Sequence, residues 1–166
     1  MTKAMFCGGH APKEPLHYRE CGLDDVYLVS GYERIDAGDG TEDLVVQNID
    51  GLHHAIAECL ITERKALTGK EFAFLRRHLE LTQPALATEL GTTVQNIYRW
   101  ETGKSRIPGS AETLLRIICL SRIRDGIAAA KASEIVRQLR EMEHPSHGRM
   151  MFAGTKRGWV PTVACA

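Results

Sequence analysis

The segment from Thr93 to Gly103 interleaves two large apolar side chains with amide, aromatic and basic ones. Ile97 and Trp100 lie three positions apart, which places them together on the buried face of a helix. In the major groove of DNA, glutamine and asparagine pair with adenine, arginine pairs with guanine, and valine can contact a thymine methyl group. We therefore expect a DNA-reading helix near Val94–Glu101, with contacts from Thr93, Val94, Gln95, Asn96, Tyr98 and Arg99, of which Arg99 suits phosphate better than a base.

Two further helices must precede the reading helix and position it. Each of the three has a capping residue and an ending of the expected type. The first helix begins at a T-x-x-E capping box, Thr68 and Glu71, and ends near Glu80. The second begins at Thr82, has Pro84 in its first turn and ends at Gly91. The third begins at Thr93 and ends at Gly103. The sequence thus predicts three short helices separated by tight turns.

Five residues at fixed offsets predict that the second and third helices form a helix-turn-helix unit, at about Thr68 to Thr113. The unit needs, in order, a polar residue that contacts the DNA backbone, a small residue where the helices cross, a turn glycine and two core residues. The matching residues are Gln83, Ala87, Gly91, Ile97 and Trp100. Ala87 is small because two helices joined by a tight turn cross close to its β-carbon.

The same region resembles the Cro and phage-repressor class of regulators, often called the Xre family. The resemblance covers about Thr68 to Ser121 and is carried by Leu81-Thr82-Gln83, Leu86-Ala87, Leu90-Gly91, Arg99-Trp100-Glu101 and Gly103-Lys104. It implies that Arg76 on the first helix pairs with Glu101. It also implies that Gln83 contacts a phosphate and that the residues after Thr93 enter the major groove.

The charge of the chain is divided between its two parts. The full chain is neutral, but residues 1–60 have a net charge of −7 and the remainder +7. A basic segment favours contact with a polyanion, and Lys104 and Arg106 follow the reading helix where cations can hold the DNA backbone. One such unit buries too little surface for tight operator binding, so we expect a homodimer on a pseudo-palindromic operator.

Before the helix-turn-helix, the pattern predicts a small β-rich region. Runs rich in β-branched residues at Asp25–Tyr32 and Glu42–Ile49 flank a turn-forming cluster, Asp36–Thr41, and favour a β-hairpin with an acidic tip. Leu52–Ile61 follows as a helix, because its apolar residues share one face. These residues are Leu52, Ile56, Cys59 and Leu60.

The expected organisation is a mobile tail over 1–14, the β-hairpin and helix region over 15–62, the helix-turn-helix domain over 63–126, and a C-terminal region over 127–166. The last region should contain a helix at Lys131–Met142, then two short strands or one bent strand between Met150 and Ala164. Either end region could supply the dimer contact. We therefore expect a mainly α fold with a small β-rich N-terminal region and a short C-terminal strand region, α+β overall.

The run from Tyr18 to Ile61, joined to this helix-turn-helix, also resembles the layout of MqsA-type antitoxins. That family places a zinc-binding domain with paired CxxC motifs before an Xre-like domain, whereas this chain retains only Cys21 near the first location. His17, Cys21, His53, His54 and Cys59 are the residues that could supply metal ligands. We expect no metal and no cofactor, because a cysteine on an apolar helix face is commonly a buried thiol.

Several classes of protein are disfavoured. Five cysteines without a CxxC pair argue against a secreted disulfide framework, and no run approaches the ~20 apolar residues of a membrane helix. The chain lacks the GxSxG, HExxH and phosphate-loop motifs of enzymes. We expect a cytoplasmic, non-enzymatic transcriptional repressor. The alternatives are an antitoxin, whose acidic part neutralises a basic toxin, and a metal-responsive regulator using His53 and Cys21.

Overall fold

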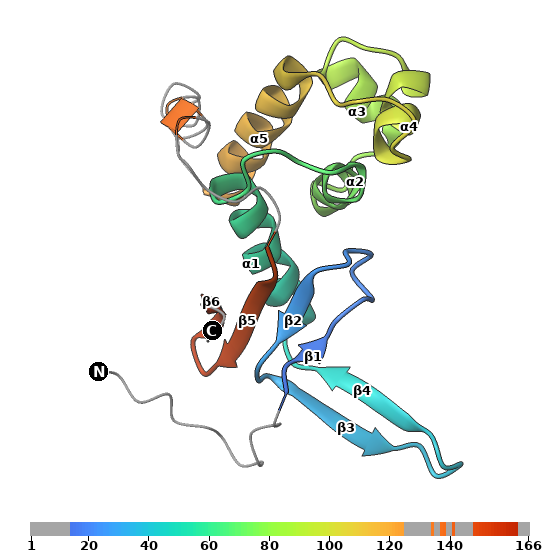
Figure 1. Cartoon of the computed structure of the whole chain (residues 1–166), viewed down its shortest axis with the longest axis vertical. Coiled ribbons are helices and arrows are strands. Elements are labelled where there is room, and N and C mark those ends of the chain that lie inside the picture. Colours follow the sequence, from blue (N-terminus) through green and yellow to red (C-terminus); the bar gives the residue numbers. More distant parts are fainter. Residues whose placement is uncertain (1–13, 125–133, 135–136, 139–140, 142–147, 163–166) are drawn as a thin grey trace.

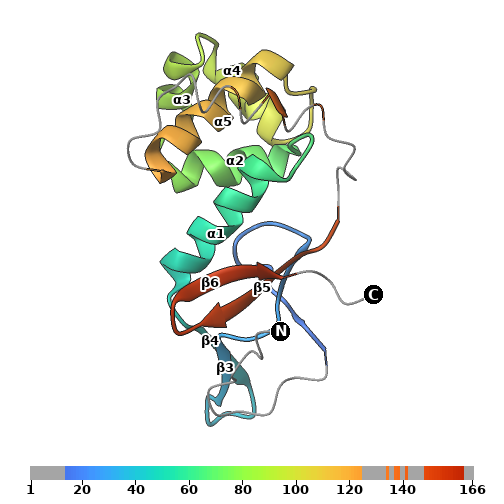
Figure 2. The same ribbon diagram turned by 90° about the vertical axis from the view of Figure 1, so that its left-hand side faces the viewer.

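The computed structural model describes residues 14–124, 134, 137–138, 141 and 148–162. Its helices are α1 Ile49–Thr62, α2 Gly69–His78, α3 Gln83–Glu89, α4 Val94–Glu101 and α5 Gly109–Ile123. Its strands are β1 Leu16–His17, β2 Val26–Leu28, β3 Tyr32–Asp36, β4 Glu42–Val46, β5 Met150–Thr155 and β6 Gly158–Thr162. Helix α1 leads from a β-rich part into the group formed by α2 to α5 (Figure 1). A view turned by 90° shows the same two-part arrangement (Figure 2).

The expectation of a mainly helical fold is wrong. Within these described ranges, five helices accompany six strands in two sheets, and the fold is α+β. The larger sheet has the order β1-β2-β5-β6, and β2 pairs with β5 in parallel, with Val26 opposite Met150. This sheet forms only when distant segments of the chain meet, and such short strands carry too few alternating positions to reveal the pairing.

A β-hairpin is present, but its first strand is not the expected one. The second strand is confirmed as β4, yet β4 pairs with β3, whereas the run that begins at Asp25 forms β2 of the larger sheet. The chain turns between the two at Gly31, whose φ of +85° disfavours any residue with a side chain. A β-carbon there would also lie 2.6 Å from the ring of Trp159. The hydrophobic pattern continues through this turn and so conceals it.

The three helices expected around the helix-turn-helix are confirmed with their caps. Thr68 and Glu71 form both halves of the capping box, with the Thr68 N–H donating to the Glu71 carboxylate at 2.7 Å. The Thr82 and Thr93 hydroxyls each accept the backbone N–H three residues on. These bonds satisfy amide groups that have no partner within the helix, so local sequence fixes each start.

Helix α1 was expected at Leu52–Ile61 and is confirmed, with its apolar face buried. A buried arginine on α5 connects the end of α1 to the group formed by α2 to α5. Arg116 donates to the carbonyls of Leu60 at 2.7 Å, Ile61 at 2.8 Å and Arg64 at 2.7 Å, and Glu112 accepts from the same guanidinium. The Arg64 side chain pairs in turn with Asp25 and with Glu71. These bonds join α1 to the helices that follow.

Two further expectations concern segments that are largely undescribed. The tail expected over 1–14 lies outside the described residues except for Glu14, and of the helix expected at Lys131–Met142 only residues 134, 137, 138 and 141 are described. The two-strand alternative between Met150 and Ala164 is the one observed, because β5 and β6 pair antiparallel.

The crossing of α3 and α4 predicts the effect of enlarging Ala87, which is 3 % exposed. We expect Ala87→Leu to lower the free energy of unfolding by ~1–3 kcal/mol, because the added atoms have no space between the helices. Urea unfolding of the full chain measures it. Ala66→Leu makes the same change at an exposed site and should leave the midpoint nearly unchanged. Equal midpoints for both variants would contradict a tight crossing at Ala87.

Three histidines lie where α1 packs on α2. His53 lies 3.3 Å from the Tyr18 hydroxyl and edge-on to Phe74, while His78 stacks on Phe74 and faces His54. Burial lowers the pKa of His53, against a smaller opposing effect of Asp50. Burial also lowers the pKa of His78, and the neighbouring His54 and His53 lower it further.

Stability should therefore fall as the pH drops below about 6.5, the unfolded histidine pKa, because the unfolded chain takes up protons first. We expect the urea midpoint to decrease between pH 7.5 and 5.5, and the His53→Gln/His78→Gln double variant to show a smaller decrease. His17→Gln, which alters a histidine in the β-rich part, serves as the control. A double variant with the same pH dependence as the parent would refute this role.

Candidate nucleic-acid interface

Helix α4 has one buried side and one exposed side. Ile97 is fully buried and Trp100 is 6 % exposed, whereas Val94 and Tyr98 are 42 % and 45 % exposed. The other residues expected to read DNA are exposed as well: Thr93, Gln95, Asn96 and Arg99. The expected contacts therefore lie together on the solvent-facing surface of a single helix.

The exposed side chains differ in how far they are already engaged. The Thr93 hydroxyl accepts the Asn96 backbone N–H at 3.2 Å, and the Asn96 amide donates to the Thr92 hydroxyl at 3.0 Å. The side chains of Gln95 and Arg99 make no hydrogen bond or ion pair to any part of the chain that the structure describes. Gln95 and Arg99 are thus available to an external partner, while Thr93 stabilises the start of the helix.

A largely buried ionic cluster holds α4 against its two neighbours. Arg76 of α2 donates to both carboxylate oxygens of Glu101, at 2.6 and 3.1 Å, and also to the Leu81 carbonyl at 2.9 Å. The structure thus brings together Arg76 and Glu101, as the resemblance implies. Gln83 joins the same cluster, because its amide donates to Glu101 at 2.7 Å. The contact observed for Gln83 is therefore an internal one that links α3 to the end of α4.

Sequence reasoning missed a close contact between α2 and the end of α4. A β-carbon on Gly69 would collide with the carbonyl oxygen of Trp100, and the Phe72 and Trp100 rings meet edge to face at 5.9 Å. Only glycine allows this approach of two backbones. The signal available in the sequence was the glycine directly after the helix cap Thr68. Many residue types occur at this position of a helix, so the glycine did not by itself indicate a close contact.

The two cations of the following loop occupy different environments. The Lys104 ammonium lies 3.3 Å from the Tyr98 hydroxyl and 4.8 Å from the centre of its ring. Arg106 is exposed and makes no hydrogen bond or ion pair with the described residues. Arg106 is thus open to a phosphate, while Lys104 covers Tyr98 on the surface of α4.

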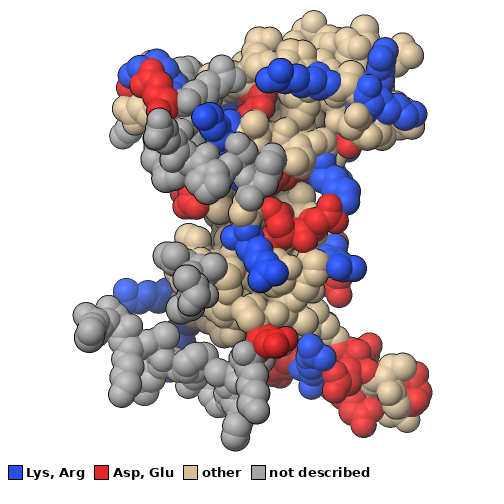
Figure 3. Space-filling model, viewed as in Figure 1, with Lys and Arg blue, Asp and Glu red and all other residues tan. Residues whose placement is uncertain are grey.

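Charge is separated along the molecule. Figure 3 shows lysine and arginine side chains over the end that holds α3 and α4, and carboxylates gathered on the β3–β4 hairpin at the opposite end. Residues 32–46 of this hairpin carry five carboxylates, and their one cation, Arg34, is paired with Glu42 at 3.0 Å. A polyanion would be attracted to the helical end and repelled by the hairpin.

The residues weighed as metal ligands are spread over the β-rich part and α1. His17 stacks on Tyr27, and the Cys21 thiol lies 3.8 Å from the Tyr18 carbonyl oxygen, to which it donates. The His53 ring lies beside Phe74. Among the described residues, no group of three or more histidine, cysteine or acidic side chains is placed to hold a metal ion.

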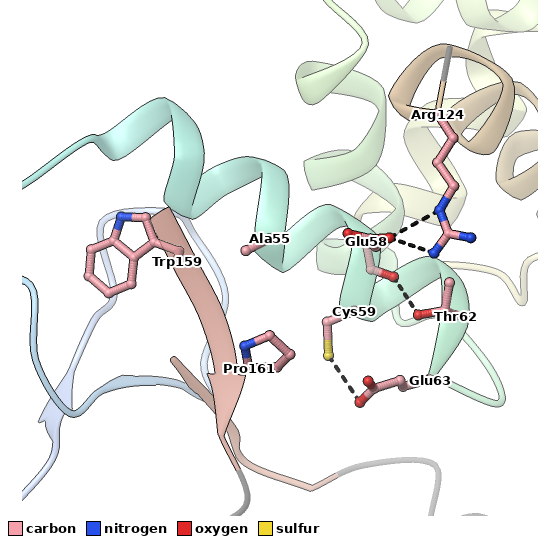
Figure 4. A pocket seen from close by; sticks show the side chains of 8 residues that line it. All are labelled: Ala55, Glu58, Cys59, Thr62, Glu63, Arg124, Trp159 and Pro161. Atoms are coloured by element: carbon pink, nitrogen blue, oxygen red, sulfur yellow. Dashed lines mark hydrogen bonds and ion pairs between the residues drawn. The ribbon is translucent and has the colours of Figure 1, made fainter. Parts of the chain in front are cut away.

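Cys59, another member of that set, lines a cavity of about 320 Å³ between α1 and β6 (Figure 4). Its thiol donates to Glu63 at 3.5 Å, and burial raises its pKa to about 12. A thiol that stays protonated is a weak nucleophile and a weak metal ligand. The cavity wall also holds the Glu58–Arg124 ion pair, at 2.5 Å. The cavity lies on α1, away from the exposed side of α4.

Within the described part of the chain, no helix is long and apolar enough to cross a bilayer. Comparisons of the chain with models of protein families, with curated proteins and with solved structures give no match. The resemblance to Xre regulators therefore depends on the residues of α2 to α4 themselves.

Proposed function

We propose that this protein is a sequence-specific DNA-binding transcriptional regulator, a repressor that binds its operator as a homodimer and inserts α4 into the major groove. The observation that carries the proposal is the division of α4 into a held side and an exposed polar side. The held side is fixed by Ile97, Trp100 and the Glu101 cluster. The exposed side presents unengaged amide and guanidinium groups. An α-helix with its side chains is about 10–12 Å across, which matches the ~12 Å width of the major groove.

The exposed residues divide into base readers and backbone contacts. Gln95 lies in the first turn of α4, where a side chain reaches the floor of the groove and an amide can pair with adenine. Arg99 lies near the helix end and Arg106 in the loop beyond it, positions from which cations reach phosphates. Base contacts supply specificity, and phosphate contacts supply affinity and register.

The charge separation orients the complex. The acidic hairpin lies at the far end of the molecule from α4, so DNA can approach the helical end without contacting it (Figure 3). Two copies on a pseudo-palindrome would place their α4 helices about 34–36 Å apart, one turn of DNA.

Selection of bound duplexes from a random DNA pool by the full-length protein tests the proposal. The expected result is an enriched sequence with two half-sites related by dyad symmetry. Mass measurement in solution, with and without the enriched duplex, reports whether two chains bind. Failure to enrich any sequence at low salt, by a folded protein, would overturn the proposal.

The hairpin favours a second candidate function, that of an antitoxin which neutralises a basic protein and also binds DNA. Its exposed surface combines the carboxylates with two exposed aliphatic side chains, Ile35 at 49 % and Val45 at 44 %. Co-purification of a small basic protein with the parent, and its loss in a Glu33→Lys/Asp43→Lys variant that still binds DNA, would support this function. A parent that purifies alone when the neighbouring genes are co-expressed argues for a plain regulator.

The position of Gln95 predicts that Gln95→Ala weakens binding to the enriched operator by ~1–3 kcal/mol and relaxes the preference at one base pair per half-site. The unfolding midpoint should stay unchanged, since Gln95 is exposed. Titration of the operator and of its single-base variants measures both effects. A variant that discriminates among these duplexes as the parent does would show that Gln95 reads no base.

Arg106→Gln provides the matched variant for a phosphate contact. We expect it to weaken binding to all duplexes alike and to make the slope of log affinity against log salt shallower by ~0.9 per chain. Affinity measured at several salt concentrations, for the operator and an unrelated duplex, gives the slope. An unchanged slope would place Arg106 away from the DNA.

A further inference from the structure

Two apolar side chains occupy the surface of α4 that should be polar. Val94 is 42 % exposed and Tyr98 is 45 % exposed, and the two are four residues apart, so they are neighbours on the same face. The adjoining face of the helix holds the core residues Ile97 and Trp100. A surface helix normally places its apolar residues in a single stripe. Val94 and Tyr98 extend this stripe from the core onto the exposed surface of α4, and we term the pair the apolar ridge.

The ridge is supported by the loop that follows α4. Lys104 lies over the Tyr98 ring, 4.8 Å from its centre, and its ammonium contacts the phenol oxygen at 3.3 Å. The Tyr98 ring is therefore held at the surface of α4 by a cation–π contact and a hydrogen bond. A ring held in this way loses little freedom when a ligand covers it.

The ridge lies among the polar groups that are placed to meet DNA. Gln95 follows Val94 directly, and Arg99 follows Tyr98, and both side chains are exposed. A ligand that pairs with these polar groups also contacts the ridge, which runs beside them on the same helix. In the major groove, the thymine C5-methyl is the apolar group on the base edges, whereas the other exocyclic groups donate or accept hydrogen bonds.

We propose that the Val94–Tyr98 ridge reads thymine through its C5-methyl group, so that each operator half-site presents thymine methyl groups to α4. The inference rests on the proposed function and adds the chemical class of DNA that the site takes. Burial of one methyl group against apolar carbon changes affinity about fourfold, from its transfer free energy. The ridge thus discriminates A·T from G·C pairs without a hydrogen bond.

Replacement of thymine by uracil tests this inference, because it removes the methyl group and leaves every hydrogen-bonding group in place. The probe is the duplex enriched from the random pool, synthesised with each thymine in turn changed to uracil. We expect the full-length parent to lose about fourfold in affinity at one or two positions per half-site. The remaining positions should show no loss.

Two variants assign the effect to the ridge. Val94→Thr keeps the side-chain shape but replaces one of its two methyl groups by a hydroxyl, so at one of those positions it should lose less affinity than the parent when thymine is changed to uracil. Ile35→Thr makes a comparable change on the hairpin, at a side chain 49 % exposed, and should retain the full sensitivity. Loss of sensitivity in both variants would overturn the assignment.

The DNA-side substitution separates the failure of this inference from that of the proposed function. If the parent binds the enriched duplex but tolerates uracil at every position, the ridge does not read methyl groups, although the protein still binds DNA. If no duplex is enriched, the proposed function itself fails. Because the uracil series uses the unaltered protein, a misfolded Val94→Thr chain would leave the test intact.

Discussion

The ion pair between Arg76 and Glu101 is the interaction on which the geometry of α4 depends. It is bidentate, and the two side chains are 13 % and 8 % exposed. Charged groups so far removed from water are costly unless they are paired, and loss of one partner of a buried pair typically costs about 3–5 kcal/mol. Gln83 donates to the same carboxylate. Glu101 therefore fixes the end of α4 to two helices at once, and the orientation of the exposed side follows from that.

A second buried arginine sets the relation between the two parts of the molecule. Arg116 binds carbonyl groups at the end of α1 that have no partner within the helix, and Glu112 balances its charge. Hydrogen bonds to backbone carbonyls, as well as apolar contacts, therefore attach α1 and the β-rich part to the helical group. The acidic hairpin is held at the opposite end of the molecule from α4. The uneven charge along the sequence therefore gives the folded molecule one acidic end and one basic end.

The parts of the fold that were predictable from sequence are those fixed by residues close together in the chain. The caps at Thr68, Thr82 and Thr93 bond to amides three residues away, so a short pattern identifies each helix start. The pairing of β2 with β5 depends on residues more than a hundred positions apart, and nothing local specifies it. The first strand of the hairpin lies later in the chain than expected for a related reason, because Gly31, where the chain turns, packs closely on Gly154 and Trp159, which are distant in the sequence.

The candidate interface shows the same division between local and non-local information. The identity of the exposed residues follows from helical periodicity, because Ile97, Trp100 and Glu101 face inward and the other residues of α4 face outward. What each exposed residue is free to do depends on neighbours that periodicity does not reveal. Gln83 is engaged by Glu101, and Lys104 by Tyr98, whereas Gln95 and Arg106 keep their polar groups open within the described structure. A residue of the right type at the right spacing becomes a ligand contact only when the fold leaves its polar groups unpaired.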